Sequence, residues 1–167
     1  MQIDSLDDLY VDQLADIYDA EKRLVKALPK MAQKASTPEL RSAFEDHVQK
    51  TRHHVERLEE IFQELGRDAT AKKCKAMMGL ISEGKDILDK DIDPKIRDAG
   101  IVAAAQKVEH YEIAAYGTLR TLAETRGDRR AAQLLQETLN EEKEADHKLT
   151  VVAESSINMQ AAGRTSR

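Results

Sequence analysis

Apolar side chains recur every three or four residues along most of the chain, which is the spacing of one face of an α-helix. Charged side chains fill the positions between them. The pattern predicts four long amphipathic helices over about residues 5–35, 36–66, 94–126 and 129–155. Because each helix has a continuous apolar face that must be buried, the pattern predicts an all-α fold.

Local signals mark where these helices begin and bend. Ser5 followed by Asp8 resembles a capping box in which Asp replaces Glu. Thr37 is the expected N-cap of the second helix, with Pro38 at its first helical position. Pro29 lies within the first helix and is expected to kink its last turn.

The lengths of the connections indicate how the helices are arranged. The first and second helices, and likewise the third and fourth, are joined by a few residues, so each pair forms an antiparallel hairpin. Residues 67–93 form a connection of about 27 residues with a helical pattern of its own. A helix of about 28 residues is roughly 42 Å long, and such a connection can return along most of that length. Two hairpins with one long crossover predict a ferritin-like four-helix bundle, with an array of α-hairpins or a three-helix fold as alternatives.

The chain is long enough for one domain with its own core. It has 167 residues, a usual length for a single domain. Gly and Pro together number only 10 (7 + 3), too few for a turn-rich all-β protein. We expect one domain over residues 1–158 and a frayed C-terminal tail over residues 159–167.

Charge and composition exclude several classes of function. The net charge of −5 makes nucleic acid an unexpected partner. A single cysteine excludes an internal disulfide, a CxxC redox pair and a four-cysteine metal site. No apolar run approaches the roughly 18 residues of a membrane span, and the first residues do not resemble a signal peptide. We therefore expect a cytoplasmic protein without a membrane partner.

Acidic side chains interrupt three of the apolar faces. Glu21 continues the apolar spacing of the first helix. Glu112 does so in the third helix, with Glu109 three residues earlier on the same face. Glu142 lies on the apolar face of the fourth helix, and Asp146 follows one turn later.

The second helix carries imidazoles on its apolar face instead. His47 and Thr51 continue the apolar spacing, and His54 lies alongside. All of these polar groups lie near the middle of their helices. Because the hairpins are antiparallel, mid-helix positions fall at similar depth, and we expect the groups to converge.

The energetics of burial narrow what such a cluster can be. One unpaired buried carboxylate costs several kcal/mol, and four or five would rival the roughly 5–15 kcal/mol that stabilise a domain. The groups must be protonated, paired, solvated or bound to cations, and Lys107 and Lys143 occupy neighbouring positions off the apolar faces. Carboxylates with imidazole are the ligand set for iron or manganese. We therefore expect one or two Fe ions, with Mn as an alternative, and the candidate ligands are Glu21, His47, His54, Glu109, Glu112, Glu142 and Asp146.

Each candidate has a structural alternative. A single buried Glu can be a hydrogen-bonded core residue, and so can His47. His54 and Asp146 could lean out to solvent, and His147 is expected to face water. Glu141 is interpreted as part of the solvated face. Cys74 is expected to be a small buried apolar residue, and three tyrosines are expected to anchor the core, with an electron-relay role as the alternative: Tyr18, Tyr111 and Tyr116.

Several motifs resemble the YciE/YciF group of bacterial stress proteins. The similarity covers about residues 3–155, and residues 108–119 are its most specific part. The motifs are Ala20-Glu21-Lys22-Arg23-Leu24, His47-x3-Thr51-x2-His54, Val108-Glu109-His110-Tyr111-Glu112 and Leu139-Asn140-Glu141-Glu142-Lys143. This resemblance implies a ferritin-like fold, a homodimer and no established activity.

The wider ferritin-like superfamily, with its rubrerythrins, implies a di-iron pattern from which this chain departs. Glu21 and Glu109-x-x-Glu112 match that pattern. Thr51-x-x-His54 has Thr where the pattern has Glu, and Glu142 is followed by Ala145 where His would stand. Glu144-x-x-His147 fits the spacing from a less inward position. These departures put a standard ferroxidase site in question, and one ion, two ions through an altered ligand set or a vestigial site remain open.

Two functions from different classes follow. The first is a stress-associated metal-binding protein that handles Fe²⁺ or peroxide, with an external electron donor if it is redox-active. The candidate bridging ligands in this first function are Glu21 together with Glu109 or Glu112. The candidate terminal ligands are Glu142 and either His47 or His54. The second is a non-catalytic structural or interaction protein whose site is metal-free.

Overall fold

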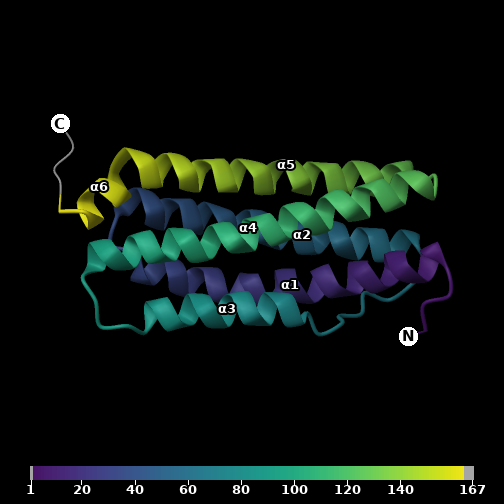
Figure 1. Cartoon of the computed structure of the whole chain (residues 1–167). Helices are drawn as coiled ribbons and strands as arrows, with labels where there is room; N and C mark the ends of the chain where they lie inside the picture. The colour runs from purple at the N-terminus through teal and green to yellow at the C-terminus, as the bar shows by residue number, and fades with distance from the viewer. Residues whose placement is uncertain (1, 164–167) are drawn as a thin grey trace.

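The computed structural model describes residues 2–163, which form helices, turns and connecting segments without a β-strand in that range (Figure 1). The four predicted long helices are confirmed, with ends within a few residues of those expected. The helical pattern in the crossover is confirmed as a fifth helix. In chain order the elements are α1 (Leu6–Lys34), α2 (Pro38–Glu64), α3 (Lys75–Leu88), α4 (Pro94–Thr125), α5 (Arg129–Val152), the π-helical turn η1 (Ala153–Ile157) and α6 (Asn158–Ala161).

The long helices form the predicted ferritin-like bundle. Figure 1 shows α1 and α2 as one antiparallel hairpin and α4 and α5 as the other. The second hairpin begins at the end of the bundle opposite to where α2 finishes, so the crossover travels the length of the bundle. Its helix α3 packs along α1 and α4. This topology excludes the simple hairpin array and the three-helix fold.

Helical structure continues past residue 158, where we expected the domain to end. The turn η1 buries Ile157, and α6 packs against α4 and ends at Ala161. Of the predicted tail, residues 164–167 lie outside the described residues.

The start of α1 is capped as its sequence predicts. Ser5 Oγ accepts a hydrogen bond from the Asp8 backbone N–H at 3.1 Å. In return, Asp8 Oδ2 accepts from the Ser5 hydroxyl at 2.6 Å and from the Asp4 backbone N–H at 3.3 Å. Pro29 lies inside α1, and the helix continues beyond it to Lys34.

The predicted N-cap of α2 is confirmed in position, but its side chain has a different partner. Thr37 is the N-cap residue of α2 by position, but its side chain makes no capping hydrogen bond. Its hydroxyl instead donates to Asp98 Oδ2 at 2.6 Å. The buried Asp98 carboxylate of α4 also accepts from the Thr37 N–H and from the N–H and hydroxyl of Ser36, at 2.7–2.9 Å. One acidic side chain thus joins the turn of the first hairpin to the beginning of the second.

The core follows the apolar faces that the sequence predicts. Its largest fully buried apolar side chains are Tyr10, Leu14, Ile17, Leu24, Leu40, Phe44, Leu58, Ile61, Phe62, Met77, Ile101 and Tyr116. Among residues 2–163, no helix combines the length and hydropathy that crossing a bilayer requires.

Candidate metal centre

Six of the seven candidate ligands converge in the middle of the bundle, and all six are buried. They come from all four long helices because each lies on the inward face of its own helix, as the spacing predicts. α1 provides Glu21, α2 provides His47 and His54, α4 provides Glu109 and Glu112, and α5 provides Glu142.

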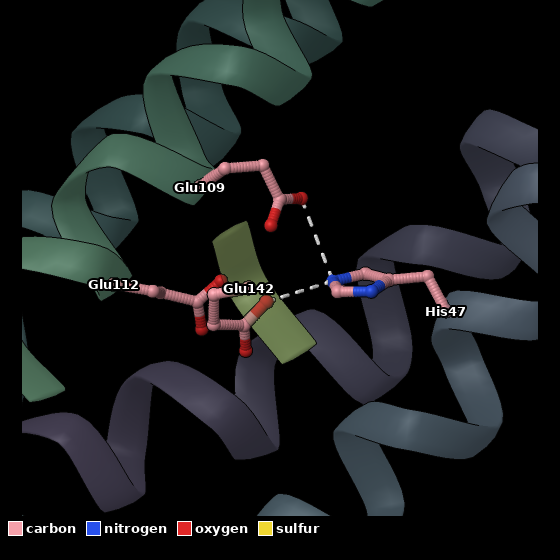
Figure 2. Close-up of side chains that lie close together, drawn as sticks. All are labelled: His47, Glu109, Glu112 and Glu142. Carbon is pink, nitrogen blue, oxygen red and sulfur yellow. Dashed lines mark ion pairs between the residues drawn. The ribbon is translucent and has the colours of Figure 1, made fainter. Parts of the chain in front are cut away.

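Four of these side chains form a first group of possible ligands. One nitrogen or oxygen atom from each of His47, Glu109, Glu112 and Glu142 lies within 4.8 Å of all the others. His47 Nε2 is 3.5 Å from Glu109 Oε1 and 3.6 Å from Glu142 Oε2. In Figure 2, the two glutamates of α4 and Glu142 of α5 point toward the edge of the His47 ring that carries this nitrogen.

A second group shares one residue with the first. Potential ligand atoms of Glu21, His54 and Glu142 also lie within 4.8 Å of one another. His54 Nδ1 is 2.9 Å from Glu142 Oε1 and 3.3 Å from Glu21 Oε1. Glu142 therefore belongs to both groups, whereas the sequence suggested Glu21 with Glu109 or Glu112 as bridging ligands and Glu142 as terminal.

Asp146 does not join either group. Its carboxylate accepts a hydrogen bond from Gln106 Nε2 at 3.1 Å and lies 3.4 Å from His110 Nε2 at the edge of the bundle. Thr51 is buried at the position where the superfamily pattern has Glu, but its hydroxyl donates to the His47 carbonyl at 2.9 Å. His147 is exposed, as expected.

The sequence interpretation missed the role of Glu141. This residue was assigned to the solvated face, but it is half-buried and its Oε2 lies 2.8 Å from His54 Nε2. Arg57 donates to both Glu141 oxygens, at 2.6 and 3.0 Å. A carboxylate that accepts from one ring nitrogen directs the other nitrogen toward the cluster, as partners of metal-bound histidines do. The spacing along α5 contains no signal for this role, because the partners of Glu141, His54 and Arg57, both lie on α2.

One of the three tyrosines considered from the sequence contacts a candidate ligand. The buried Tyr116 hydroxyl donates to Glu21 Oε1. Tyr18 instead donates to Glu59 at 2.7 Å, and Tyr111 donates to Asp16 at 2.7 Å. Cys74 is buried, as expected, and its Sγ lies 3.1 Å from the Tyr111 hydroxyl.

Burial and mutual repulsion shift the protonation of the acidic groups. Burial, followed by the charge of Glu142, raises the pKa of Glu109 and that of Glu112 well above the ordinary value. Burial also raises the pKa of Glu21. Without a bound cation, these carboxyl groups therefore keep their protons to a higher pH than an ordinary glutamate does.

The histidines respond in opposite directions. Burial lowers the pKa of His47, which favours the neutral ring that can bind a metal. Burial would also lower the pKa of His54, but Glu21, Glu141 and Glu142 outweigh it and raise that pKa to about 12. Burial would raise the pKa of Glu142, yet His54 and His47 more than compensate and lower it. His54 and Glu142 thus form a buried ion pair.

The donor set fits a divalent cation. Both oxygens of Glu112, both of Glu142 and Oε2 of Glu21 make no hydrogen bond to any described residue. Among residues 2–163, no lysine or arginine is buried, and the basic side chains that lie within ion-pair distance of Glu21, Glu109 and Glu142 are those of His47 and His54. Oxygen-rich sites with one or two imidazoles are the usual environment of iron and manganese. A cation there would bind the oxygens that make no hydrogen bond and replace the protons that burial favours.

The fold and this centre define a ferritin-like helical bundle with carboxylate and imidazole groups at its middle. The ferritin-like fold is also evident in a two-domain protein from Anabaena variabilis that contains DJ-1/ThiJ/PfpI-like and ferritin-like domains, with a TM-score of 0.61 at 19% identity over 92% of this chain and 38% of that one. Within this class, the chain belongs to the family described as a domain of unknown function, DUF892, whose sequence profile matches residues 5–162.

Relatives with higher identity match along nearly the whole chain. The protein YciF of Escherichia coli is 44% identical over 165 residues, which cover 98% of this chain and 99% of YciF. The crystal structure of this E. coli stress protein superposes with a TM-score of 0.89 over 93% of this chain and 98% of that one. The structure of YcfI from Rhodopseudomonas palustris gives the same TM-score at 42% identity, over 91% and 97% of the two chains. The resemblance to the YciE/YciF group is therefore confirmed.

Proposed function

We propose that this protein is a stress-associated metal-binding protein that holds one or two Fe ions in the middle of its bundle. The observation that carries the proposal is the shared position of Glu142 between two groups of buried ligands. Carboxylate oxygens without a hydrogen bond in both groups support it, and the similarity to a protein known as a stress protein supports the biological setting.

Each ligand has a distinct part in this proposal. His47, Glu109 and Glu112 would hold one ion and Glu21 and His54 the other, with Glu142 between them. Glu141 would direct His54, and Tyr116 would hold Glu21 in place through its hydroxyl. Bound iron would supply a redox centre for Fe²⁺ oxidation or peroxide reduction. Because the single cysteine leaves no rubredoxin-type site in the chain, peroxide reduction would draw on an external electron donor.

One observation favours the alternative of a structural protein with a metal-free site. His54 already neutralises part of the acidic charge through its contacts with Glu21, Glu141 and Glu142. A protonated Glu109 and Glu112 beside this ion pair would give a centre that is tolerable without metal. Metal content distinguishes the two functions because only the first requires a cation.

The deciding experiment measures iron per chain by elemental analysis after anaerobic incubation with Fe²⁺ and desalting. We expect about two ions per chain for the wild type, as in other dinuclear carboxylate bundles. Glu142→Gln should lower the amount of iron bound at both positions because it removes a ligand from each group. Asp146→Asn, which lies outside both groups, should bind as much iron as the wild type. A wild-type protein that binds no iron would overturn the proposal in favour of the metal-free alternative.

The assembly and location belong to the same proposal. We expect a homodimer in the cytoplasm, as the resemblance to the YciE/YciF group implies. Analytical ultracentrifugation at micromolar concentration would measure the assembly, and a monomer there would contradict the dimer without affecting the metal centre.

A further inference from the structure

We propose that a pocket between α2 and α5 is the route by which divalent cations reach this centre, and that two ion pairs at its mouth control the rate. The inference rests on the proposed function, because a route is needed only if metal binds. It adds to that function an entry path and four residues that set the rate of metal uptake.

The pocket is the place where the buried cluster comes nearest to solvent. It has a volume of about 220 Å³, and His47 and Glu109 form part of its lining. These two side chains are the members of the cluster with measurable exposure, at 6% and 2%. Glu21, His54, Glu112 and Glu142 are all at 0%. The His47 and Glu109 side of the cluster is therefore its outer side.

Small side chains explain why the groove between these helices stays open at this point. Ala43 of α2 and Ala145 of α5 both line the pocket, and neither extends beyond Cβ. Phe44 and Leu149 add apolar walls. These apolar walls offer no ligand to a hydrated cation. The first cluster carboxylate that a cation meets beyond them is that of Glu109.

On the opposite side of the bundle, the described residues form a pocket that does not reach the cluster. The crossover helix α3 packs against α1 and α4 along part of their length (Figure 1). This second pocket is lined by Asp16, Tyr111 and Thr118 among others, and none of the six converging ligands lines it.

Two ion pairs connect α2 to α5 at the mouth of the first pocket. Lys50 Nζ lies 2.8 Å from Glu144 Oε2, and Lys148 Nζ lies 3.0 Å from Asp46 Oδ2. All four side chains line the pocket and reach solvent. Exposed pairs of this kind are weak and exchange readily with water. Each pair places a carboxylate that attracts a cation beside an ammonium that repels it, so the balance of charge at the mouth sets the rate of passage.

The first test measures the rate of Co²⁺ uptake by stopped-flow absorbance at low ionic strength. Lys50→Gln and Lys148→Gln should each accelerate uptake about two- to fivefold, and Asp46→Asn and Glu144→Gln should slow it by a similar factor. The differences should shrink in high salt because screening removes them. Arg130→Gln is the matched control, since it breaks the Glu60–Arg130 pair between the same two helices away from the pocket, and its uptake rate should equal that of the wild type.

A second variant tests the route by size. Ala145→Phe should fill the pocket and slow uptake at every ionic strength. Ala114→Phe, on the second pocket, should leave the rate unchanged, and thermal melts would establish that both variants fold. If the wild type binds neither Co²⁺ nor, in the elemental analysis above, iron, the proposed function fails. If it binds Co²⁺ but neither the charge variants nor Ala145→Phe change the rate, the route alone is overturned.

Discussion

At the scale of single residues, Glu112 shows most clearly how the metal-free centre lowers the stability of the folded protein. Its side chain is fully buried, and neither oxygen makes a hydrogen bond within the described part of the chain. Burial and the neighbouring carboxylates raise its pKa well above the ordinary value of Glu. Such a group favours the folded protein most at low pH, and that contribution is lost as the pH rises through the folded-state pKa.

The metal-free protein should therefore lose the stabilising contribution of Glu112 as the pH rises from about 5. In Glu112→Gln this contribution is absent, because the amide does not titrate. We expect the free energy of unfolding of the variant to fall less steeply between about pH 5 and pH 8. Urea denaturation at several pH values with a chelator present measures both slopes, and equal slopes would contradict the assignment.

Helical spacing predicted most of the acidic side chains that turn inward. Glu21, Glu112 and Glu142 lie where the spacing of their helices places them, at the middle of the bundle. The spacing could not distinguish Glu141 from Asp146, which lie beside and one turn beyond Glu142. Glu141 is drawn inward by Arg57 of α2, whereas Asp146 is held at the edge by Gln106 of α4. Both partners come from other helices, and a single-helix pattern contains no information about them.

At the scale of elements, the packing of the crossover helix on the second hairpin depends on one close approach. A Cβ atom on Gly100 of α4 would lie 2.7 Å from Ile87 Cγ2 of α3, which is too close without movement of the isoleucine. Gly79 in α3 has no atom within 4 Å of such a Cβ. Both glycines lie inside helices, where alanine is intrinsically favoured by about 1 kcal/mol.

Two alanine substitutions should thus have opposite effects on stability. Gly79→Ala should stabilise the protein by about 0.5–1 kcal/mol. Gly100→Ala should destabilise it, because the displacement of Ile87 outweighs the same helix preference. Ile87→Leu, which removes the Cγ2 methyl, should relieve the clash in the double variant. Urea denaturation measures all three, and a stabilised Gly100→Ala protein would refute the close approach.

The crossover also shows where prediction from sequence ends. Its apolar pattern indicates a helix, but the position at which α3 begins depends on contacts from elsewhere in the fold. The Cys74 backbone N–H donates to Asp19 of α1 at 2.8 Å, and Cys74 Sγ accepts from the Met77 N–H at 3.4 Å. A cysteine at an N-cap has no strong local signature, so the sequence predicted its burial without its capping role.

At the scale of the whole molecule, Asp98 connects the two hairpins at one end of the bundle. It accepts four hydrogen bonds from Ser36 and Thr37, which are 62 and 61 residues away in the sequence. Hydrogen bonds to a charged group contribute more than neutral ones, and a buried donor that loses its partner is costly. The carboxylate therefore stabilises the docking of one hairpin on the other rather than either hairpin alone.

Asp98→Ala should lower the free energy of unfolding by about 3 kcal/mol or more, because it removes four hydrogen bonds to a buried carboxylate that join the two hairpins. Asp93→Ala is the matched control. Asp93 caps α4 locally through the Lys95 N–H at 2.8 Å, and its loss should cost about 1 kcal/mol. Chemical denaturation compares the two, and similar losses would show that Asp98 acts only locally.

Glu142 separates the proposed centre into two groups of ligands that differ in their distance from solvent. The group that contains His47 and Glu109 lies next to the pocket, whereas Glu21 and His54 lie behind it. With the proposed pocket as their route, ions would move in single file, so the first to arrive is the last to leave. Metal exchange would then be sequential, and a protein with two different ions would form simply from the order in which the metals were supplied.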